Sequence, residues 1–191
     1  MTSEQRLYLK DVPSWNDVER IISSMIRMVR QGQAPLRDLC IIGLLATTGM
    51  RTSELLLLKR SDFNYEANIL TIQQLKKKGD YLRQTVLSSD LKPFLLEYMK
   101  DKQNDERVFD LSRRQVLNIT HKYSEMILGK RMRNHAFRHA YAIRILEKTR
   151  DVELCRRLIG HTRLETVKIY LDFSIGDRVK EVSDAIKIDK K

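Results

Sequence analysis

The stretch from His135 to Tyr170 gathers side chains that can handle a phosphate group. It reads His135-Ala-Phe-Arg138-His139, continues to Leu-Ile-Gly-His161-Thr and ends at Tyr170. Arginine carries a permanent charge on a planar fork that matches phosphate oxygens. Histidine donates a hydrogen bond or moves a proton near neutral pH. A tyrosine oxygen becomes a nucleophile when its neighbours activate it. These residue types therefore indicate phosphoryl-transfer chemistry.

Two further cationic segments could join this chemistry. Arg51 lies in Thr-Thr-Gly-Met-Arg51-Thr-Ser-Glu, directly after an apolar helical segment. The glycine permits a tight turn, and the next helix N-terminus presents free N–H groups to an anion. Three lysines, Lys76–Lys78, crowd a predicted hairpin, whose tip can deliver an ammonium group to a leaving oxygen. Taken alone, Arg51 also fits a surface charge, and the lysines fit the protection of an edge strand.

The other signals also have ordinary interpretations when each is taken alone. His135 and Arg138 lie one helical turn apart, which fits a solvated basic face as well as a phosphate site. His161 also fits a capping histidine, and Tyr170 fits a half-buried tyrosine of an amphipathic helix. The spacing of His135 and His139 matches a zinc pair. That motif lacks its glutamate here, and no Cys or His cluster completes a tetrahedral site, so we expect no metal.

Length and composition narrow the class of protein. The 191 residues correspond to one large domain or two small ones, and 42% hydrophobic residues are enough for a sizeable core. The net charge of +11 favours a polyanionic partner, with DNA or RNA ahead of a membrane, although a basic protein without such a partner has the same charge. There is no apolar run of about 18 residues and no apolar leader segment at the N-terminus. We therefore expect a cytoplasmic protein, in which Cys40 and Cys155 are reduced thiols of the core.

Hydrophobic periodicity predicts the helices that must position these residues. Capping boxes open three of them, at Ser14 with Asp17, at Ser112 with Gln115 and at Thr162 with Glu165. The segment after Pro35 is apolar nearly all round and should be central and buried. The helices are expected at about residues 14–29, 36–47, 52–58, 88–98, 112–127, 135–148, 152–159 and 162–170, with Thr52 and Asp151 as N-caps and Gly49, Gly129 and Gly160 at C-termini.

Between residues 62 and 87 the hydrophobic period changes from that of helices to that of strands. Residues 62–65, 69–72 and 83–87 read as short strands, joined by turns at 66–68 and 78–80. The sequence therefore predicts an α+β fold, mainly α, with a small antiparallel three-stranded sheet. Seven Lys or Arg but only one acid lie between residues 130 and 150, so part of the positive charge falls on the helix that carries Arg138.

Taken in order, these residues form a specific pattern. The order Arg…Lys…His-x-x-Arg…His…Tyr, carried by Thr-Gly-Met-Arg51, His135-Ala-Phe-Arg138-His139, Leu-Ile-Gly-His161 and Lys-Ile-Tyr170, resembles the tyrosine recombinases of the phage-integrase family. All six positions of that family's active-site pattern have a matching residue. The resemblance covers roughly residues 13–175. It implies the catalytic-domain architecture of that family and a double-stranded DNA substrate.

The resemblance implies a role for each matching residue. Tyr170 would attack a DNA phosphodiester, form a 3′-phosphotyrosyl bond and release a 5′-hydroxyl. Arg51 and Arg138 would clamp the non-bridging oxygens and stabilise the charge of the transition state. His161 would also contact the phosphate, and His135 would act as acid or base toward the tyrosine oxygen.

A hairpin lysine would protonate the leaving 5′-oxygen. Lys78 matches the family's lysine because it directly precedes Gly79 at the turn, and Lys76 is the second choice. The covalent intermediate conserves the energy of the broken bond, so no ATP is needed. The sequence also contains no Walker-type loop and no evident acidic cluster for two metal ions, so we expect no cofactor and no small-molecule substrate.

The resemblance also suggests how the chain is divided. We expect an arm at residues 1–12, a catalytic domain at 13–174 and an amphipathic tail helix at 175–191, without the separate N-terminal DNA-binding domain of many family members. The chain would then be a minimal recombinase, like the short fimbrial-switch invertases, or a catalytic fragment. The tail resembles the segment that many recombinases dock into a neighbouring subunit, which would give dimers or tetramers on DNA. Packing on its own domain is the alternative.

Two rival functions remain open from the sequence. Residues 152–171 scan acceptably as a helix-turn-helix with Gly160 in the turn, which would suit a DNA-binding regulator but leaves Arg51 and Tyr170 without a role. A type IB topoisomerase would share the tyrosine chemistry but relax DNA without site-specific strand exchange. The short chain and the Xer-like motifs favour a recombinase.

Overall fold

The computed structural model describes residues 12–76 and 79–160. It confirms the predicted fold class, because helices dominate and the strands form one antiparallel sheet. The helices are α2 (Trp15–Arg30), α3 (Leu36–Thr48), α4 (Thr52–Leu55), the 3₁₀ turn η1 (Arg60–Asp62), α5 (Lys92–Tyr98), α6 (Arg113–Leu128), α7 (Asn134–Thr149) and α8 (Val152–Ile159). The strands are β1 (Phe63–Asn64), β2 (Ile69–Lys76) and β3 (Gly79–Val86).

The helix N-termini that carry side-chain caps lie where the sequence predicts them. At α2, Ser14 Oγ accepts the backbone N–H of Asp17 at 3.1 Å, and the Asp17 carboxylate accepts the N–H of Ser14 at 3.3 Å. The same reciprocal box opens α6 at Ser112, and Asp151 caps α8. Each cap satisfies N–H groups that the first helical turn leaves without partners, so these starts are encoded locally.

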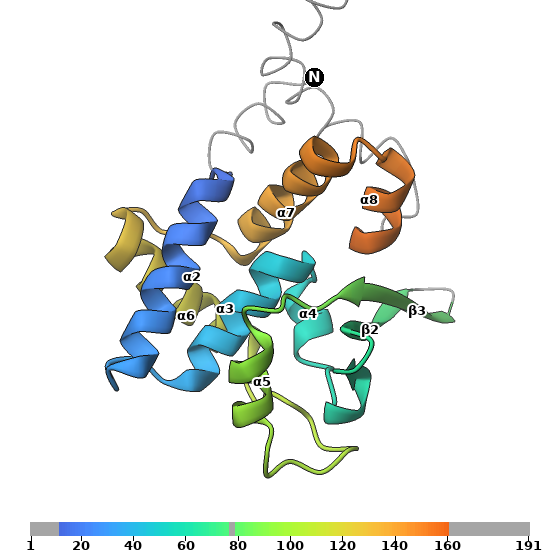
Figure 1. Ribbon diagram of the computed structural model, residues 1–191, viewed down its shortest axis with the longest axis horizontal. Helices are drawn as coiled ribbons and strands as arrows, with labels where there is room; N and C mark the ends of the chain where they lie inside the picture. The colour runs from blue at the N-terminus through green and yellow to red at the C-terminus, as the bar shows by residue number, and fades with distance from the viewer. Residues whose placement is uncertain (1–11, 77–78, 161–191) are drawn as a thin grey trace, which may run out of the picture.

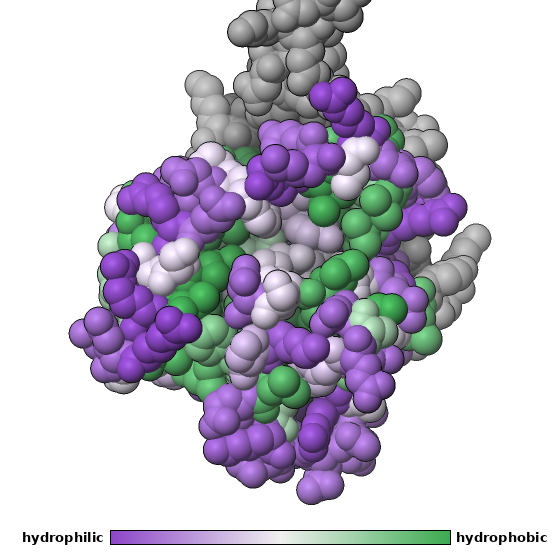
Figure 2. Space-filling model, viewed as in Figure 1, coloured by the Kyte–Doolittle hydropathy of each residue, from purple (hydrophilic) through white to green (hydrophobic). Residues whose placement is uncertain are grey.

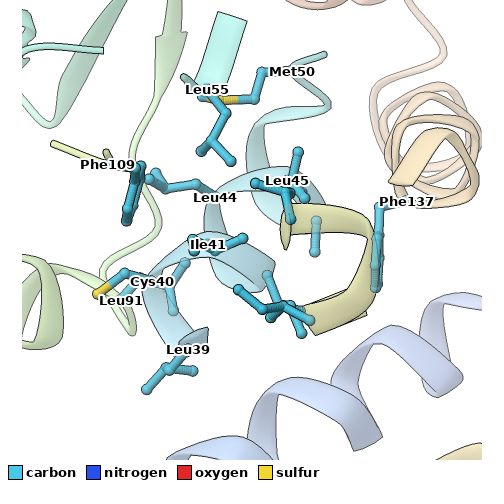
Figure 3. Close-up of a cluster of buried hydrophobic side chains, with 14 of the residues drawn as sticks. Leu39, Cys40, Ile41, Leu44, Leu45, Met50, Leu55, Leu91, Phe109 and Phe137 are labelled. Atoms are coloured by element: carbon cyan, nitrogen blue, oxygen red, sulfur yellow. The ribbon is translucent and has the colours of Figure 1, made fainter. Parts of the chain in front are cut away.

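Helix α3 forms the centre of the core. Most of its residues are fully buried on every side, as the continuous apolar segment predicts. It contacts α2, α5, α6 and α7, and Figure 3 shows its side chains surrounded by residues of other segments, including Leu91, Phe109 and Phe137. The prediction of two thiols in the core is confirmed, since Cys40 and Cys155 are both buried and free. Burial raises the pKa of each thiol to about 12.

The sheet has the order β1-β2-β3. Strands β2 and β3 extend further toward the turn that joins them than the sequence predicted. The β2–β3 pairing runs from Ile69 opposite Val86 to Lys76 opposite Gly79. Residues 79 and 80, predicted as turn, therefore belong to β3, whereas the first predicted strand is reduced to residues 63–64 because η1 precedes it. The buried face of this hairpin includes the polar residues Gln74, Arg83 and Thr85. Gln74 lies beyond the predicted end of its strand, where its polarity breaks the apolar alternation from which strands are inferred, whereas Arg83 and Thr85 lie within the predicted strand 83–87.

Two predicted helix N-caps were wrong by one to three residues. Arg51, and not Thr52, is the N-cap of α4. Helix α5 begins at Lys92, because the backbone from Ser88 to Leu91 forms a turn first. Both errors have the same cause: a serine or threonine hydroxyl is a common cap, but other local hydrogen bonds can replace it.

The elements that carry the candidate residues converge on one side of α3. Figure 1 shows α8 beside α7 and facing the β2–β3 hairpin, with α4 between α3 and β2. Hydrophilic residues cover much of the face shown in Figure 2, and the visible hydrophobic residues lie toward its middle. No helix in the described ranges is both long and apolar enough to cross a lipid bilayer. The predicted arm, the helix at 162–170 and the tail lie outside the described residues.

Candidate active site

Arg51 lies at the corner between α3 and α4, which we define as residues 48–55. Gly49 ends α3 with a φ of 61°, in the left-handed region that glycine adopts without strain. Arg51 then caps α4, and its side chain is 37% exposed. The sequence suggested that free N–H groups at this helix N-terminus could bind an anion. The backbone N–H of Arg51 is not free, however, because Glu54 Oε2 accepts it at 2.8 Å. The site at this corner is therefore the guanidinium group of Arg51.

Glu54 holds that guanidinium in place. Its Oε1 accepts a hydrogen bond from Arg51 Nη1 at 2.8 Å, and its Oε2 accepts one from Arg83 Nη2 at 3.0 Å. Glu54 is only 4% exposed. Burial alone would raise the pKa of its carboxyl, but the charges of Arg83, Arg51 and Arg138 and the hydrogen bond from Arg51 N–H lower it overall. The resulting carboxylate orients Arg51 from the buried side and leaves its outer side toward solvent.

Arg138 connects the α3–α4 corner to the end of α8. It is 2% exposed and lies on α7, one turn after His135. Its Nη1 donates to the carbonyl of Gly49 at 2.6 Å, and its Nη2 donates to the carbonyl of Ile159. Because the guanidinium is rigid and planar, these two bonds fix its orientation. Arg138, the most buried cation of the site, therefore also links the α3–α4 corner to the end of α8 by hydrogen bonds.

His135 lies within the electric field of both arginines. Burial lowers the pKa of its imidazole, and the charges of Arg138 and Arg51 lower it further. Asn134, one residue earlier, donates from its side chain to Thr52 Oγ1 at 2.9 Å and thus ties the start of α7 to α4. A neutral imidazole at neutral pH can accept a proton from a nearby hydroxyl group. The arrangement therefore suits His135 as a general base.

His139 lies one turn further along α7. Its ring is edge-on to that of His135, with centroids 6.2 Å apart. Burial, followed by the charges of His135 and Arg138, lowers its pKa to about 4. Among the described residues, no three His, Cys, Asp or Glu side chains are grouped as a metal site would require.

Comparison with known proteins shows which family this chain belongs to. The sequence model of the phage integrase family matches residues 15–175, most of the chain. The chain belongs to the phage integrase family. It is 26% identical over 170 residues to tyrosine recombinase XerA of Saccharolobus solfataricus, which covers 89% of this chain and 57% of that protein. It is 29% identical over 167 residues to XerA of Pyrococcus furiosus, covering 80% of this chain and 55% of the relative.

Solved structures extend the comparison to three dimensions. The crystal structure of XerH site-specific recombinase bound to a palindromic difH substrate, a post-cleavage complex, superposes with a TM-score of 0.74. The two sequences are 25% identical, and the match covers 90% of this chain and 52% of the other. The chain thus spans little more than half the length of the relatives and structures that it matches.

The phage integrase fold brings together three of the six predicted site residues within the described part of the chain. Arg51, His135 and Arg138 share one electrostatic neighbourhood, since both arginines act on the pKa of His135. Lys78, His161 and Tyr170 lie outside the described residues, so their predicted roles stay predictions. Lys76, the second choice, is the last residue of β2.

Sequence reasoning missed three residues of this phage integrase site: Glu54, Arg83 and Gln74. Glu54 had a local signal, because a glutamate three residues after an N-cap can accept the N-cap backbone N–H, as it does at Arg51. For Arg83 and Gln74 the only signal was that they face the buried side of the sheet. A polar residue does not reveal that orientation in the sequence. Their contacts with residues 158–160 join segments 75 and 86 residues apart, and periodicity contains no information about such pairings.

Proposed function

We propose that this chain breaks and rejoins double-stranded DNA at specific sites through a covalent phosphotyrosyl intermediate. The oxygen of Tyr170 attacks the scissile phosphorus, the bond from phosphorus to the 5′-oxygen breaks, and a 3′-phosphotyrosyl bond forms. His135 takes the phenol proton, and Lys78, or Lys76 in its place, gives a proton to the leaving 5′-oxygen. The reverse steps rejoin the strand, so neither ATP nor a metal ion is required.

One observation carries this proposal: two guanidinium groups and an imidazole lie in one neighbourhood, where Arg138 bonds the Gly49 carbonyl and the start of α7 is bonded to α4. Arg51 presents its charge at the surface, Arg138 lies behind it, and both act on the pKa of His135. Developing charge on a phosphate in the transition state is stabilised by such fixed cations without reorganisation, which is usually the largest catalytic contribution. His161 would add a further contact to the phosphate.

The relatives support the substrate and the reaction class. Two of them bear the name tyrosine recombinase, and the XerH structure holds a difH DNA substrate after cleavage. Carried to this chain, these names support DNA as the partner. Self-association through the tail at residues 175–191 is part of the proposal that the names do not address. The proposed location of this reaction is the cytoplasm.

The experiment is the capture of covalent adducts. The protein is incubated with a random-sequence library of nicked duplexes, from which the short 5′-hydroxyl strand diffuses away after cleavage. Protein-linked DNA is then isolated under denaturing conditions and sequenced. We expect the wild-type protein to yield adducts that share a sequence, which identifies the target site.

The test variant is Tyr170→Phe, and Tyr65→Phe is its matched control. The hydroxyl of Tyr65 is buried and has no hydrogen-bond partner within the described residues, so its removal should leave adduct yield unchanged. Tyr170→Phe should bind DNA with wild-type affinity and form no adduct. Adducts from Tyr170→Phe would show that another residue is the nucleophile.

Two other outcomes would favour the rival functions. Site-specific binding without an adduct from the wild-type protein would indicate a non-enzymatic helix-turn-helix regulator. Adducts without a shared sequence, together with relaxation of supercoiled plasmids, would indicate a type IB topoisomerase.

A further inference from the structure

The end of α8 is held by side chains from three other positions in the fold. The last carbonyls of a helix have no partner within the helix, and here three successive ones, at residues 158–160, accept side-chain hydrogen bonds. Arg83 Nη1 donates to the first, Arg138 Nη2 to the second, and Gln74 Nε2 to the third at 3.4 Å. Two guanidinium groups at the negative end of the helix dipole add an electrostatic attraction.

Arg83 is the member of this group that reaches the rest of the site. While its Nη1 bonds the end of α8, its Nη2 donates to Glu54 Oε2, the same atom that accepts the backbone N–H of Arg51. One planar guanidinium therefore spans the α8 end and the carboxylate that orients Arg51. A lysine ammonium, a compact point charge, cannot reproduce this geometry.

The Arg83–Glu54 pair is almost fully buried. A buried ion pair adds little net stability to a fold, so stability alone does not account for it. Both side chains are less than 10% exposed, and Arg83 Nε is buried without a hydrogen-bond partner in the described residues. The desolvation of two charges offsets much of their attraction, and well-packed apolar residues often stabilise a fold equally well. Orientation of neighbouring groups is a property that apolar residues would not supply.

The backbone at Gly160 fits tightly against the same two strand residues. A Cβ atom at Gly160 would lie 1.5 Å from Gln74 Nε2 and 2.7 Å from Arg83 Cδ. Gly160 also has a φ of 68°, which side chains disfavour. The position of Gly160 is thus defined by β2 and β3, and the next residue in the sequence is His161.

We propose that Arg83 is a positioning residue of the phosphate site, which orients Arg51 through Glu54 and, through the end of α8, fixes the point from which the chain continues to His161. This inference rests on the proposed function, because it assigns Arg83 a role in the same cleavage reaction. Strand β3 then contributes to catalysis without touching the DNA phosphate.

The test compares Arg83→Lys with Arg60→Lys. Arg60, in η1, makes the same kind of contact outside the hydrogen bonds of the site, since its Nη1 donates to the backbone carbonyl of Lys102. Both variants, and the wild-type protein, cleave the nicked duplex identified by adduct capture under single-turnover conditions. Each is measured on two versions of that duplex, one with the ordinary scissile phosphodiester and one with a methylphosphonate, which lacks the negative charge.

The decisive quantity is the ratio of the two cleavage rates. Well-placed guanidinium groups favour the charged substrate, so Arg83→Lys should lower the phosphodiester-to-methylphosphonate ratio by about tenfold or more. Arg60→Lys should leave it unchanged. A loss of folded protein slows both substrates equally, so the ratio separates positioning from stability.

Each remaining outcome has a definite meaning. Equal slowing of both substrates by Arg83→Lys, or no slowing at all, would refute the positioning role while leaving the proposed function intact. If wild-type protein forms no adduct on any duplex, the proposed function fails first and this inference fails with it. Should Arg83→Lys not fold, Glu54→Gln loosens Arg83 from its other end while keeping the shape of the side chain, and the same fall in the ratio is expected.

Discussion

The α3–α4 corner and the end of α8 hold their cations in different ways. At the corner, Arg51 and Glu54 are three residues apart, so the contact forms within one helical turn. At the end of α8, the donors come from residues 75, 21 and 86 positions away in the sequence. The corner is a local structure, whereas the end of α8 exists only once the sheet, α7 and α8 have packed together.

Arg138 makes hydrogen bonds in both regions. It is buried because it lies between them, whereas Arg51 contacts only the corner and stays partly exposed. Arg51 needs only Glu54 to orient it and keeps one side in solvent. Arg138 bonds the Gly49 carbonyl at the corner and the Ile159 carbonyl at the end of α8. The two arginines should therefore respond differently to the same substitution.

The largest effect is expected from Arg138→Ala. Loss of one fixed cation should slow single-turnover cleavage by about 10²–10³-fold. It also leaves two buried carbonyls without a partner, at about 1–3 kcal/mol each, so the free energy of unfolding should fall too. Arg51→Ala should slow cleavage to a similar degree but change stability much less, because its side chain is partly exposed. Denaturant titration and cleavage rates check both, and an equal loss of stability in the two variants would contradict the distinction.

A smaller effect is expected when the glycine of each region, Gly49 or Gly160, is replaced by alanine. Both Gly49 and Gly160 have positive φ, so alanine costs about 1–2 kcal/mol at either position from backbone strain. At Gly49 the new methyl group would also lie 2.5 Å from the buried ring of Tyr141, which adds about 1–3 kcal/mol of overpacking. At Gly160 the methyl group would lie 1.5 Å from Gln74 Nε2 and 2.7 Å from Arg83 Cδ, so both of these buried side chains would have to shift.

Both variants should therefore lose stability in denaturant titration, but Gly160→Ala should lose more cleavage rate for each kcal/mol of stability, because its methyl group displaces Arg83. The two variants serve as controls for each other. An equal loss of cleavage rate for each kcal/mol in the two variants would show that the end of α8 does not position the site.

The smallest effect concerns α7, which lies between the two regions. The pKa of His139 is lowered from 6.5 to about 4 in the folded protein, so the unfolded chain binds its proton first as pH falls. The stability associated with neutral His139 is present above pH 6.5 and is lost progressively as pH falls toward about 4. His139→Leu should flatten the dependence of the unfolding midpoint on pH in this window. An unchanged pH profile would show that His139 does not contribute.

Several parts of the fold could be predicted because their causes lie within a few residues. The boxes at Ser14 and Ser112, the cap at Asp151 and the buried segment after Pro35 all act through local hydrogen bonds or continuous apolar character. The extent of β2 was underestimated at Gln74, a polar residue on a buried face, and Arg83 was placed in a strand without its buried partners. Their burial depends on partners that no local pattern contains.

By itself, the sequence determined the types and order of the candidate residues, the helices that carry Arg51, His135 and Arg138, and membership of the family whose pattern they match. Only the tertiary structure decided that Glu54 and Arg83 connect them. The physical reason is that a buried charge is tolerated only with a partner at hydrogen-bond distance. For Arg83, that partner is 29 residues away in the chain and becomes adjacent only when the core has formed.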